Sequence, residues 1–222
     1  MPLILNIDSA ITSASVCLAN DKELLAIRVN ESMKDHAAWL QPAIQDLLQQ
    51  TGVGIKELAA IAVSIGPGSY TGLRIGLSTA KGLCYALGIP LIAIGTLDMM
   101  AVAGVQSPLD SDLVCPMIDA RRMEIFTAVY KKSGEKLVEP SALIVDEKSF
   151  STLLEENSIL FYGNGSEKLK RIVNTKHAIF ENIEINASEL IEISNNRFRI
   201  KEFNSVAYTE PTYIKQFYSP TK

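Results

Sequence analysis

Residues 59–88 decide the fold, and they read AAIAVSIGPGSYTGLRIGLSTAKGLCYALG. The first seven, 59–65, form a continuous apolar run, which is typical of a strand buried on both faces. Gly66-Pro67-Gly68 ends that run, and the pattern that follows predicts a helix from Ser69 or Tyr70 to Leu87. Gly88 then suits the left-handed position just beyond a helix end. A buried strand that leads directly into a long helix indicates an α/β protein.

Upstream of this unit, the sequence predicts three strands. Residues 3–7 form a buried run, and 14–19 and 24–29 follow it with the turn Asn20–Asp21 between them. Short connections of this kind join antiparallel neighbours, so we expect a three-stranded meander.

Residues 36–50 are predicted to form a helix before the central strand. Asp35 is the expected N-cap, and Pro42 either lies near the true helix start or kinks the first turns. The apolar positions recur at helical spacing along one stripe. They are Leu40, Ala43, Ile44, Leu47 and Leu48.

The chain beyond residue 88 repeats the pattern of its start. After a strand at 90–94 and a helix at 96–105, the strand 113–118 ends in Asp119, and a strand at 124–130 follows a short turn. The beginning has the same order, because the first strand ends in Asp8. This weak internal repeat predicts two lobes, 1–105 and 106–222, and the last segment could pack back on the first lobe.

The remainder of the second lobe is more polar. Residues 159–162 are predicted as a strand, and 165–173 and 187–195 as helices.

Composition restricts the class of protein. The chain has 222 residues, 47% of them hydrophobic, which is enough for a substantial core. Its net charge is −4 and its pI about 5.3, whereas a freestanding RNA-binding protein usually carries a basic face. Three cysteines in no metal or redox spacing are expected to be buried thiols of a cytoplasmic protein. Neither a signal peptide nor a membrane span is expected.

Two aspartates at strand ends raise the question of nucleotide chemistry. Sugar kinases, actin and heat-shock ATPases use paired acids of this kind to hold Mg²⁺ and phosphate, usually with a glycine after each acid. Here Asp8 is followed by Ser9 and Asp119 by alanine, so each acid could equally accept backbone N–H bonds in its own turn. The loop at 66–72 follows a strand and opens a helix, which is where anions bind, but its spacing matches neither phosphate-binding motif. The candidate residual phosphate contacts are Asp8, Ser9, Gly66, Gly68 and Asp119.

The helix after this loop has two contact rows. Tyr70, Leu73, Leu77 and further apolar residues form one seam, and Gly72, Gly76 and Ala80 form a row of small residues. Small residues let another helix approach closely, and a glycine within a helix costs roughly 1 kcal/mol relative to alanine. Packing within the lobe and a subunit interface explain the row equally well. The candidate interface residues are Leu40, Ile44, Leu47, Tyr70, Gly72, Leu73, Gly76, Leu77 and Ala80.

Metal chemistry has little support. The two histidines, His36 and His177, are far apart, and no His-x-x-x-His or Cys-x-x-Cys occurs. No metal, cofactor or catalytic residue is therefore predicted. Arg74, Lys81, Arg121 and Arg122 are possible contacts for nucleotide or tRNA, although a solvated basic side chain is the simpler interpretation.

At this point the residues resemble a known family. The block Ser64 to Leu83 is similar to the glycine-rich signature of the bacterial TsaB (YeaZ) proteins, and the resemblance covers essentially the whole chain. The start around Asp8, the segment 118–125 and the tail 210–215 resemble the same family. It implies an actin/sugar-kinase/Hsp70-like α/β fold, with two ribonuclease-H-like lobes of mixed sheets flanked by helices. It also implies a role in making threonylcarbamoyladenosine in tRNAs that read ANN codons.

The resemblance further implies a set of partners. TsaB-type proteins pair with a catalytic paralogue, TsaD, through helices of the first lobe, and they self-associate through an overlapping face. A small ATPase, TsaE, joins the complex, and tRNA is bound only through the assembly. In TsaD a metal-binding His-x-x-x-His lies on the helix after the last strand of the first lobe. Aligned by that strand, this chain has Thr96 and Met100 at those two positions. The resemblance therefore predicts a non-catalytic partner subunit with a four-helix contact from 36–50 and 70–87.

Three other functions remain open from the sequence. The first is a metallopeptidase, since relatives of this family were once classed as glycoproteases. The second is a small-molecule kinase or ATPase of the same fold. The third is a homodimeric binding module unrelated to tRNA.

Overall fold

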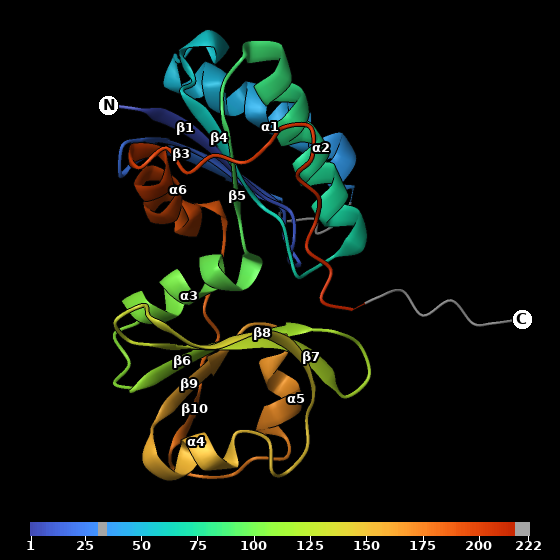
Figure 1. Ribbon diagram of the computed structural model, residues 1–222, viewed down its shortest axis with the longest axis vertical. Coiled ribbons are helices and arrows are strands. Elements are labelled where there is room, and N and C mark those ends of the chain that lie inside the picture. Colours follow the sequence, from blue (N-terminus) through green and yellow to red (C-terminus); the bar gives the residue numbers. More distant parts are fainter. Residues whose placement is uncertain (31–34, 216–222) are drawn as a thin grey trace, which may run out of the picture. The chain divides into compact units, whose positions relative to one another are not determined.

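The computed structural model describes residues 1–30 and 35–215 (Figure 1). It contains two compact units. The first comprises Met1–Met100 and Glu184–Pro211, and the second Ala101–Ile183 with the described residues from 212 onward. Residues 184–211 thus belong to the first unit. The sequence predicts 106–222 as the second lobe and leaves open that its last segment packs back on the first.

A five-stranded mixed sheet forms the centre of the first unit, in the order β3-β2-β1-β4-β5. The three strands at the start of the chain form the predicted antiparallel meander, and β4 and β5 run parallel to β1. The strands are β1 (Leu3–Asp8), β2 (Ser15–Asn20), β3 (Glu23–Val29), β4 (Ala60–Ser64) and β5 (Leu91–Ile94).

Helices cover both faces of this sheet. On one face, α1 (His36–Thr51) packs on β2 and β3, and α2 (Tyr70–Leu87) packs on β4 beside α1 (Figure 1). On the other, α6 (Leu190–Arg199), preceded by the 3₁₀ turn Ala187–Glu189, packs on β1, β4 and β5. The single helix predicted at 187–195 is therefore a 3₁₀ turn followed by a later α-helix.

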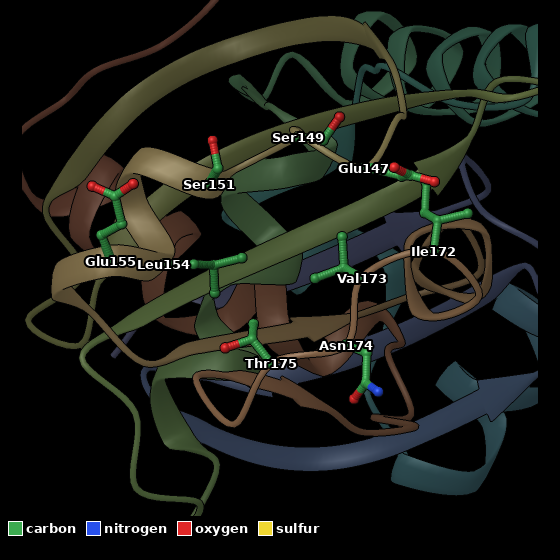
Figure 2. Close-up of a pocket in the computed structure, with 9 residues that line it drawn as sticks. All are labelled: Glu147, Ser149, Ser151, Leu154, Glu155, Ile172, Val173, Asn174 and Thr175. Atoms are coloured by element: carbon green, nitrogen blue, oxygen red, sulfur yellow. The ribbon is translucent and has the colours of Figure 1, made fainter.

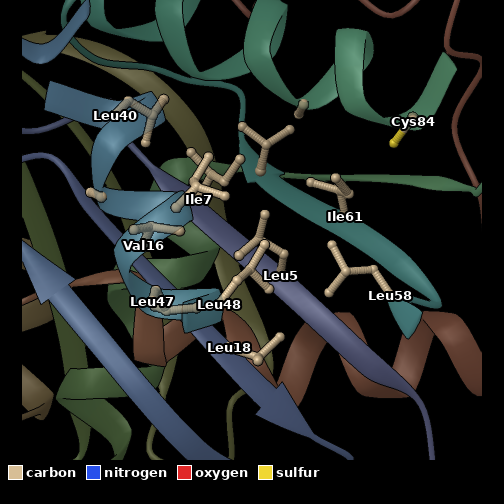
Figure 3. Close-up of a cluster of buried hydrophobic side chains, with 14 of the residues drawn as sticks. Leu5, Ile7, Val16, Leu18, Leu40, Leu47, Leu48, Leu58, Ile61 and Cys84 are labelled. Atoms are coloured by element: carbon tan, nitrogen blue, oxygen red, sulfur yellow. The ribbon is translucent and has the colours of Figure 1, made fainter. Parts of the chain in front are cut away.

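Alternation along β1 explains why the two faces differ. Leu5 and Ile7 point into the apolar core beneath α1 and α2 (Figure 3). Asn6, which lies between them, points to the other face, where its side-chain oxygen accepts a hydrogen bond from Ser194 Oγ of α6 at 2.8 Å. The strand is thus buried on both faces, as the run of apolar residues predicts.

Two details of α1 differ from the predictions. Asp35 has left-handed backbone (φ 54°) and its side chain caps no amide, so the predicted N-cap contact is wrong. Pro42 lies inside the helix and is exposed. Gly88 takes the left-handed conformation predicted for the end of α2 (φ 68°).

The second unit repeats the topology of the first. Its sheet has the order β10-β9-β6-β7-β8. Strands β6, β7 and β8 form an antiparallel meander, β9 runs parallel to β6, and β10 runs parallel to β9. β6 therefore corresponds to β1 and β8 to β3, which confirms the internal repeat. The strands are β6 (Leu113–Asp119), β7 (Glu124–Lys131), β8 (Lys136–Ile144), β9 (Ile159–Tyr162) and β10 (Ala178–Phe180).

The helices of the second unit are short. α4 (Ser151–Glu156) and α5 (Ser166–Lys170) contain six and five residues, and α5 is shorter than the helix predicted at 165–173. The longer α3 (Thr96–Gln106) passes from the first unit into the second. Lys132 Nζ caps its C-terminal end by donating to the carbonyl oxygens of Gly104, Val105 and Ser107 at 2.8–3.3 Å. None of the helices in the described ranges is both long and apolar enough to cross a bilayer.

Candidate functional site

Asp8 ends β1 in a fully buried position. Its Oδ1 accepts hydrogen bonds from Ser64 Oγ at the end of β4 and from the Ala10 amide. Its Oδ2 is buried and has no hydrogen-bond partner within the described residues. Burial raises the pKa of Asp8 to about 6 against these two hydrogen bonds, and the nearby Glu189 carboxylate contributes to the increase.

The glycine-rich loop lies directly on the turn that follows Asp8. A Cβ built on Gly68 would lie 2.2 Å from the Ala10 carbonyl oxygen, and one on Gly72 would lie 1.9 Å from that of Ser9. Only glycine permits this approach of two backbones. The glycine-rich loop and the turn after Asp8 are therefore in contact at this end of the first sheet. The phosphate contacts expected of Asp8, Ser9, Gly66 and Gly68 stay a prediction.

The loop amides are used within the lobe itself. The Ser69 amide donates to Ala10 O at 2.7 Å, the Gly66 amide to Thr96 Oγ1 at 3.0 Å, and the Gly72 amide to the N-cap Ser69 Oγ at 3.2 Å. A phosphate-binding loop presents such amides to its ligand. In this chain they hold the loop against the strand end instead.

The small-residue row of α2 faces the same turn. A Cβ on Gly76 would lie 2.3 Å from Ser9 Oγ, and Ala80 is fully buried. Packing within the lobe thus accounts for the row, and Gly76→Leu would disrupt the fold before it tested an interface. Of the nine candidate interface residues only Tyr70 is exposed, and the other eight are buried in the unit itself. These eight are Leu40, Ile44, Leu47, Gly72, Leu73, Gly76, Leu77 and Ala80. Their predicted role at a subunit interface stays a prediction.

The outward faces of α1 and α2 have a different character. Eight positions on α1 and seven on α2 are exposed, and only Asp46 and Arg74 among them are charged. Tyr85 is 86% exposed, and a Cβ on Gly82, one turn before it, would meet nothing within 4 Å. We call these exposed positions the outer helix face. They are Ala37, Ala38, Gln41, Pro42, Gln45, Asp46, Gln49, Gln50, Tyr70, Thr71, Arg74, Ser78, Gly82, Tyr85 and Ala86.

Asp119 ends β6 in the second unit, and its carboxylate binds neighbouring donor groups. Its Oδ1 accepts from Lys168 Nζ at 2.8 Å and from the Arg121 amide at 2.6 Å. Burial alone would raise its pKa, but the contacts with Lys168 and Arg121 outweigh burial and hold the pKa below its ordinary value. Its own amide donates to Asn164 Oδ1 at 2.8 Å. Asp119 therefore fixes the β6–β7 turn, which is the structural alternative left open by the sequence.

The β6–β7 turn carries unusual backbone. Arg121 and Arg122 both have positive φ, 67° and 49°. L-residues other than glycine, asparagine and aspartate rarely adopt this region, and it costs roughly 1–2 kcal/mol for each residue. Both arginine side chains are exposed. The sequence gives no signal for this conformation, because glycine and asparagine are the usual markers of such turns.

The remaining candidates have structural roles. Thr96 is buried and its hydroxyl accepts the Gly66 amide, and Met100 is buried in the core. His177 Nδ1 lies 2.7 Å from Leu154 O. No cluster of three metal-ligating side chains occurs in residues 1–30 or 35–215.

All three cysteines are free and buried, as predicted. Burial raises the pKa of Cys84 to about 11 and that of Cys115 to about 12, and it raises the pKa of Cys17 further.

The second unit also has an open cavity of about 450 Å³ beside α4 (Figure 2). Leu154 and Val173 line its apolar centre, and Glu147 and Glu155 lie on opposite sides of it in Figure 2. No residue singled out from the sequence lines this cavity, and it shares no residue with the Asp119 turn.

The chain is similar in sequence to one protein family and to several known proteins. Residues 24–215 match the family described as TsaD, tRNA N6-adenosine threonylcarbamoyltransferase. The chain is 30% identical over 173 residues to the tRNA threonylcarbamoyladenosine biosynthesis protein TsaB of Bacillus subtilis, covering 77% of this chain and 74% of that one. It is 36% identical over 129 residues to TsaB of Escherichia coli, covering 58% of this chain and 55% of that one.

The fold is shared with a solved structure described as an uncharacterized protein with similarity to peptidase YEAZ from Pseudomonas aeruginosa. The TM-score is 0.85 at 23% identity, and the match covers 97% of this chain and all of the other. Together with the repeated strand order, this defines an actin/sugar-kinase/Hsp70-like protein built from two ribonuclease-H-like units. Within that class, the chain belongs to the TsaB (YeaZ) family.

Proposed function

We propose that this chain takes part in tRNA threonylcarbamoyladenosine biosynthesis as a non-catalytic subunit that binds and activates a TsaD-type transferase. The relatives named TsaB support a role in tRNA threonylcarbamoyladenosine biosynthesis. The glycine-rich loop, which packs against the end of β1 at Asp8, supports the lack of catalysis. The observation that carries the proposal is the contact of the glycine loop with the turn after Asp8, because it uses loop amides that a nucleotide phosphate would need. ATP hydrolysis would then belong to a TsaE-type partner.

The outer helix face supports the binding part of the proposal. Depletion of charge and exposure of tyrosine are both typical of the centre of a protein interface. Gly82 adds a physical argument, because a glycine in a helix costs about 1 kcal/mol and no described atom lies within 4 Å of the position of its missing Cβ. A second pair of helices laid over this face would take advantage of the missing side chain. A TsaD-type subunit and a second copy of this chain would compete for the same surface.

The test is light scattering after size exclusion, with the chain alone and mixed with a TsaD-type subunit. We expect a one-to-one species that replaces any homodimer. Gly82→Arg places bulk and charge on the outer helix face without a clash in the unit, and arginine is the better helix former. This variant is expected to be at least as stable as the parent chain and to lose assembly and tRNA modification.

A matched control is Ile200→Arg, which adds the same side chain at an exposed position at the end of α6 (72% exposed). It is expected to assemble normally. If Gly82→Arg assembles as well as this control, the interface is elsewhere. If the parent chain forms no complex although both proteins are folded and ATP and TsaE are present, the proposed function fails, and peptidase and ATPase assays become the relevant ones.

A further inference from the structure

The β6–β7 turn combines strained backbone with two arginines whose side chains have no partner among the described residues. Arg121 and Arg122 occupy the left-handed region side by side, and both side chains are exposed. Neither side chain forms an ion pair or hydrogen bond with any described residue. A hairpin could close here with asparagine and glycine at no strain. An unfavourable backbone that holds two charged side chains outward points to a ligand for those side chains.

The neighbouring carboxylates are engaged by other cations. Asp119 Oδ1 accepts from Lys168 Nζ at 2.8 Å, and Glu124 forms an ion pair with Lys215. Lys168 Nζ also donates to the Glu124 carbonyl oxygen at 2.8 Å. These contacts neutralise the two acids within the turn and fix its base. No described residue of the unit therefore pairs with either of the two guanidinium groups.

Backbone hydrogen bonds also hold the turn in place. The Ala120 amide donates to Glu124 O at 3.0 Å, and the Val145 amide donates to Met123 O at 2.8 Å. A fixed turn loses little conformational entropy when it binds, so its side chains can set the position of a ligand. An arginine guanidinium matches phosphate oxygens, which it can bind in a bidentate manner.

We infer that the Arg121–Arg122 turn contacts the phosphate backbone of RNA, namely the tRNA on which the complex acts. This inference rests on the proposed function. The net charge of −4 gives the chain no long-range attraction for a polyanion, so the turn would act only once a partner subunit has captured the RNA. Contacts of this kind fix the register of the nucleic acid and read no sequence.

The experiment measures the affinity of the assembled complex for a tRNA transcript at several salt concentrations. Arg121→Asn/Arg122→Gly removes both charges and provides the residues that such backbone favours. The slope of log K against log salt is expected to become shallower by roughly 1.4 to 1.8, and the affinity to fall about tenfold at low salt, for two lost phosphate contacts. The melting temperature of the isolated chain is expected to stay the same or to rise. Arg121→Lys/Arg122→Lys, which keeps both charges, is expected to retain most of the salt dependence.

The control removes two other charges from the same unit. Lys148→Asn/Lys176→Asn alters exposed positions with ordinary backbone, and its salt slope is expected to match that of the parent complex. Assembly is scored separately by light scattering, so failure of the parent chain to form the complex would count against the proposed function and not against this inference. If the Arg121→Asn/Arg122→Gly complex assembles and binds tRNA with unchanged affinity and slope, the inference is overturned. Equal losses in the Lys148→Asn/Lys176→Asn control would overturn it too, because the effect would then reflect the general charge of the unit. So would failure of the Arg121→Asn/Arg122→Gly variant alone to assemble, because the turn would then make a protein contact.

Discussion

Asp8→Asn should change how the stability of the chain depends on pH. The Asp8 carboxyl is fully buried, and its pKa is raised to about 6 in the folded chain from 3.8 in the unfolded one. Between these two values the folded chain holds a proton that the unfolded chain has lost. The stabilisation by this proton is complete below about pH 4 and is lost as pH rises through 6. Stability linked to Asp8 therefore falls with increasing pH, which is opposite to the behaviour of a carboxylate in an ion pair.

The magnitude follows from the shift. About two pKa units correspond to roughly 3 kcal/mol between pH 4 and pH 7.5, at 1.36 kcal/mol per unit. Asparagine keeps an oxygen for Ser64 Oγ and the Ala10 amide, but its amide group would replace the unpartnered Oδ2. That buried donor costs about 1–3 kcal/mol at every pH. The difference between the parent chain and Asp8→Asn should thus vary with pH, whatever its absolute value.

Urea unfolding at pH 4, 5, 6 and 7.5 measures this difference directly. The parent chain should lose up to about 3 kcal/mol relative to Asp8→Asn over that range. Asp110→Asn is the control, because Asp110 is exposed, and its difference from the parent chain should stay flat. If the free-energy difference between the parent chain and Asp8→Asn is constant with pH, Asp8 does not titrate as a buried, partly unpaired acid, and the account of the strand end is wrong.

Four further substitutions test the packing, each by urea unfolding. Gly72→Ala forces a Cβ to within 1.9 Å of a carbonyl oxygen and should cost about 1–3 kcal/mol, whereas Gly82→Ala on the same helix should stabilise by about 1 kcal/mol. Equal effects of the two would contradict the packing of α2. Lys132→Met leaves three carbonyl oxygens at the end of α3 without their donor, and a loss of about 1–3 kcal/mol is expected. Gly104→Ala should destabilise by about 1–3 kcal/mol, because its Cβ would lie 2.5 Å from the Tyr162 hydroxyl; an unchanged midpoint would show that this contact can relax.

Most helices and strands of the first unit could be predicted from the sequence, because their apolar residues have strong periodicity and clear signals mark their ends. Two strands of the second unit were not predicted. β8 (Lys136–Ile144) is an edge strand with a proline and mostly half-buried or exposed residues, so its pattern is weak. The internal repeat could have found it, since β8 follows β7 as β3 follows β2. The same repeat places β10 beside β9 as β5 lies beside β4.

The site was harder to predict than the fold. Spacing alone shows that Gly72, Gly76 and Ala80 form a row on a helix, but not what that row faces. The answer depends on Ser9, which is more than sixty residues away in the chain. The role of Asp119 could not be decided for the same reason, because its partner Lys168 comes from α5 and is far away in the sequence. Long-range packing decided each case, and local pattern carries no information about it.

Unfavourable residues in this chain fall into two groups, and the difference bears on function. Gly72 weakens its helix, yet the unit offsets this by bringing two backbones into contact at the end of β1. Gly82 weakens the same helix with nothing packed against it, and Arg121 and Arg122 hold strained backbone with no described partner. An unfavourable residue whose cost is offset by packing within its own unit needs no further explanation. One whose cost no described contact offsets is expected at a surface that another molecule covers. By this criterion the unfavourable glycines near the strand end at Asp8 are explained by packing within the unit. By the same criterion we expect the outer helix face and the β6–β7 turn to be covered by another molecule.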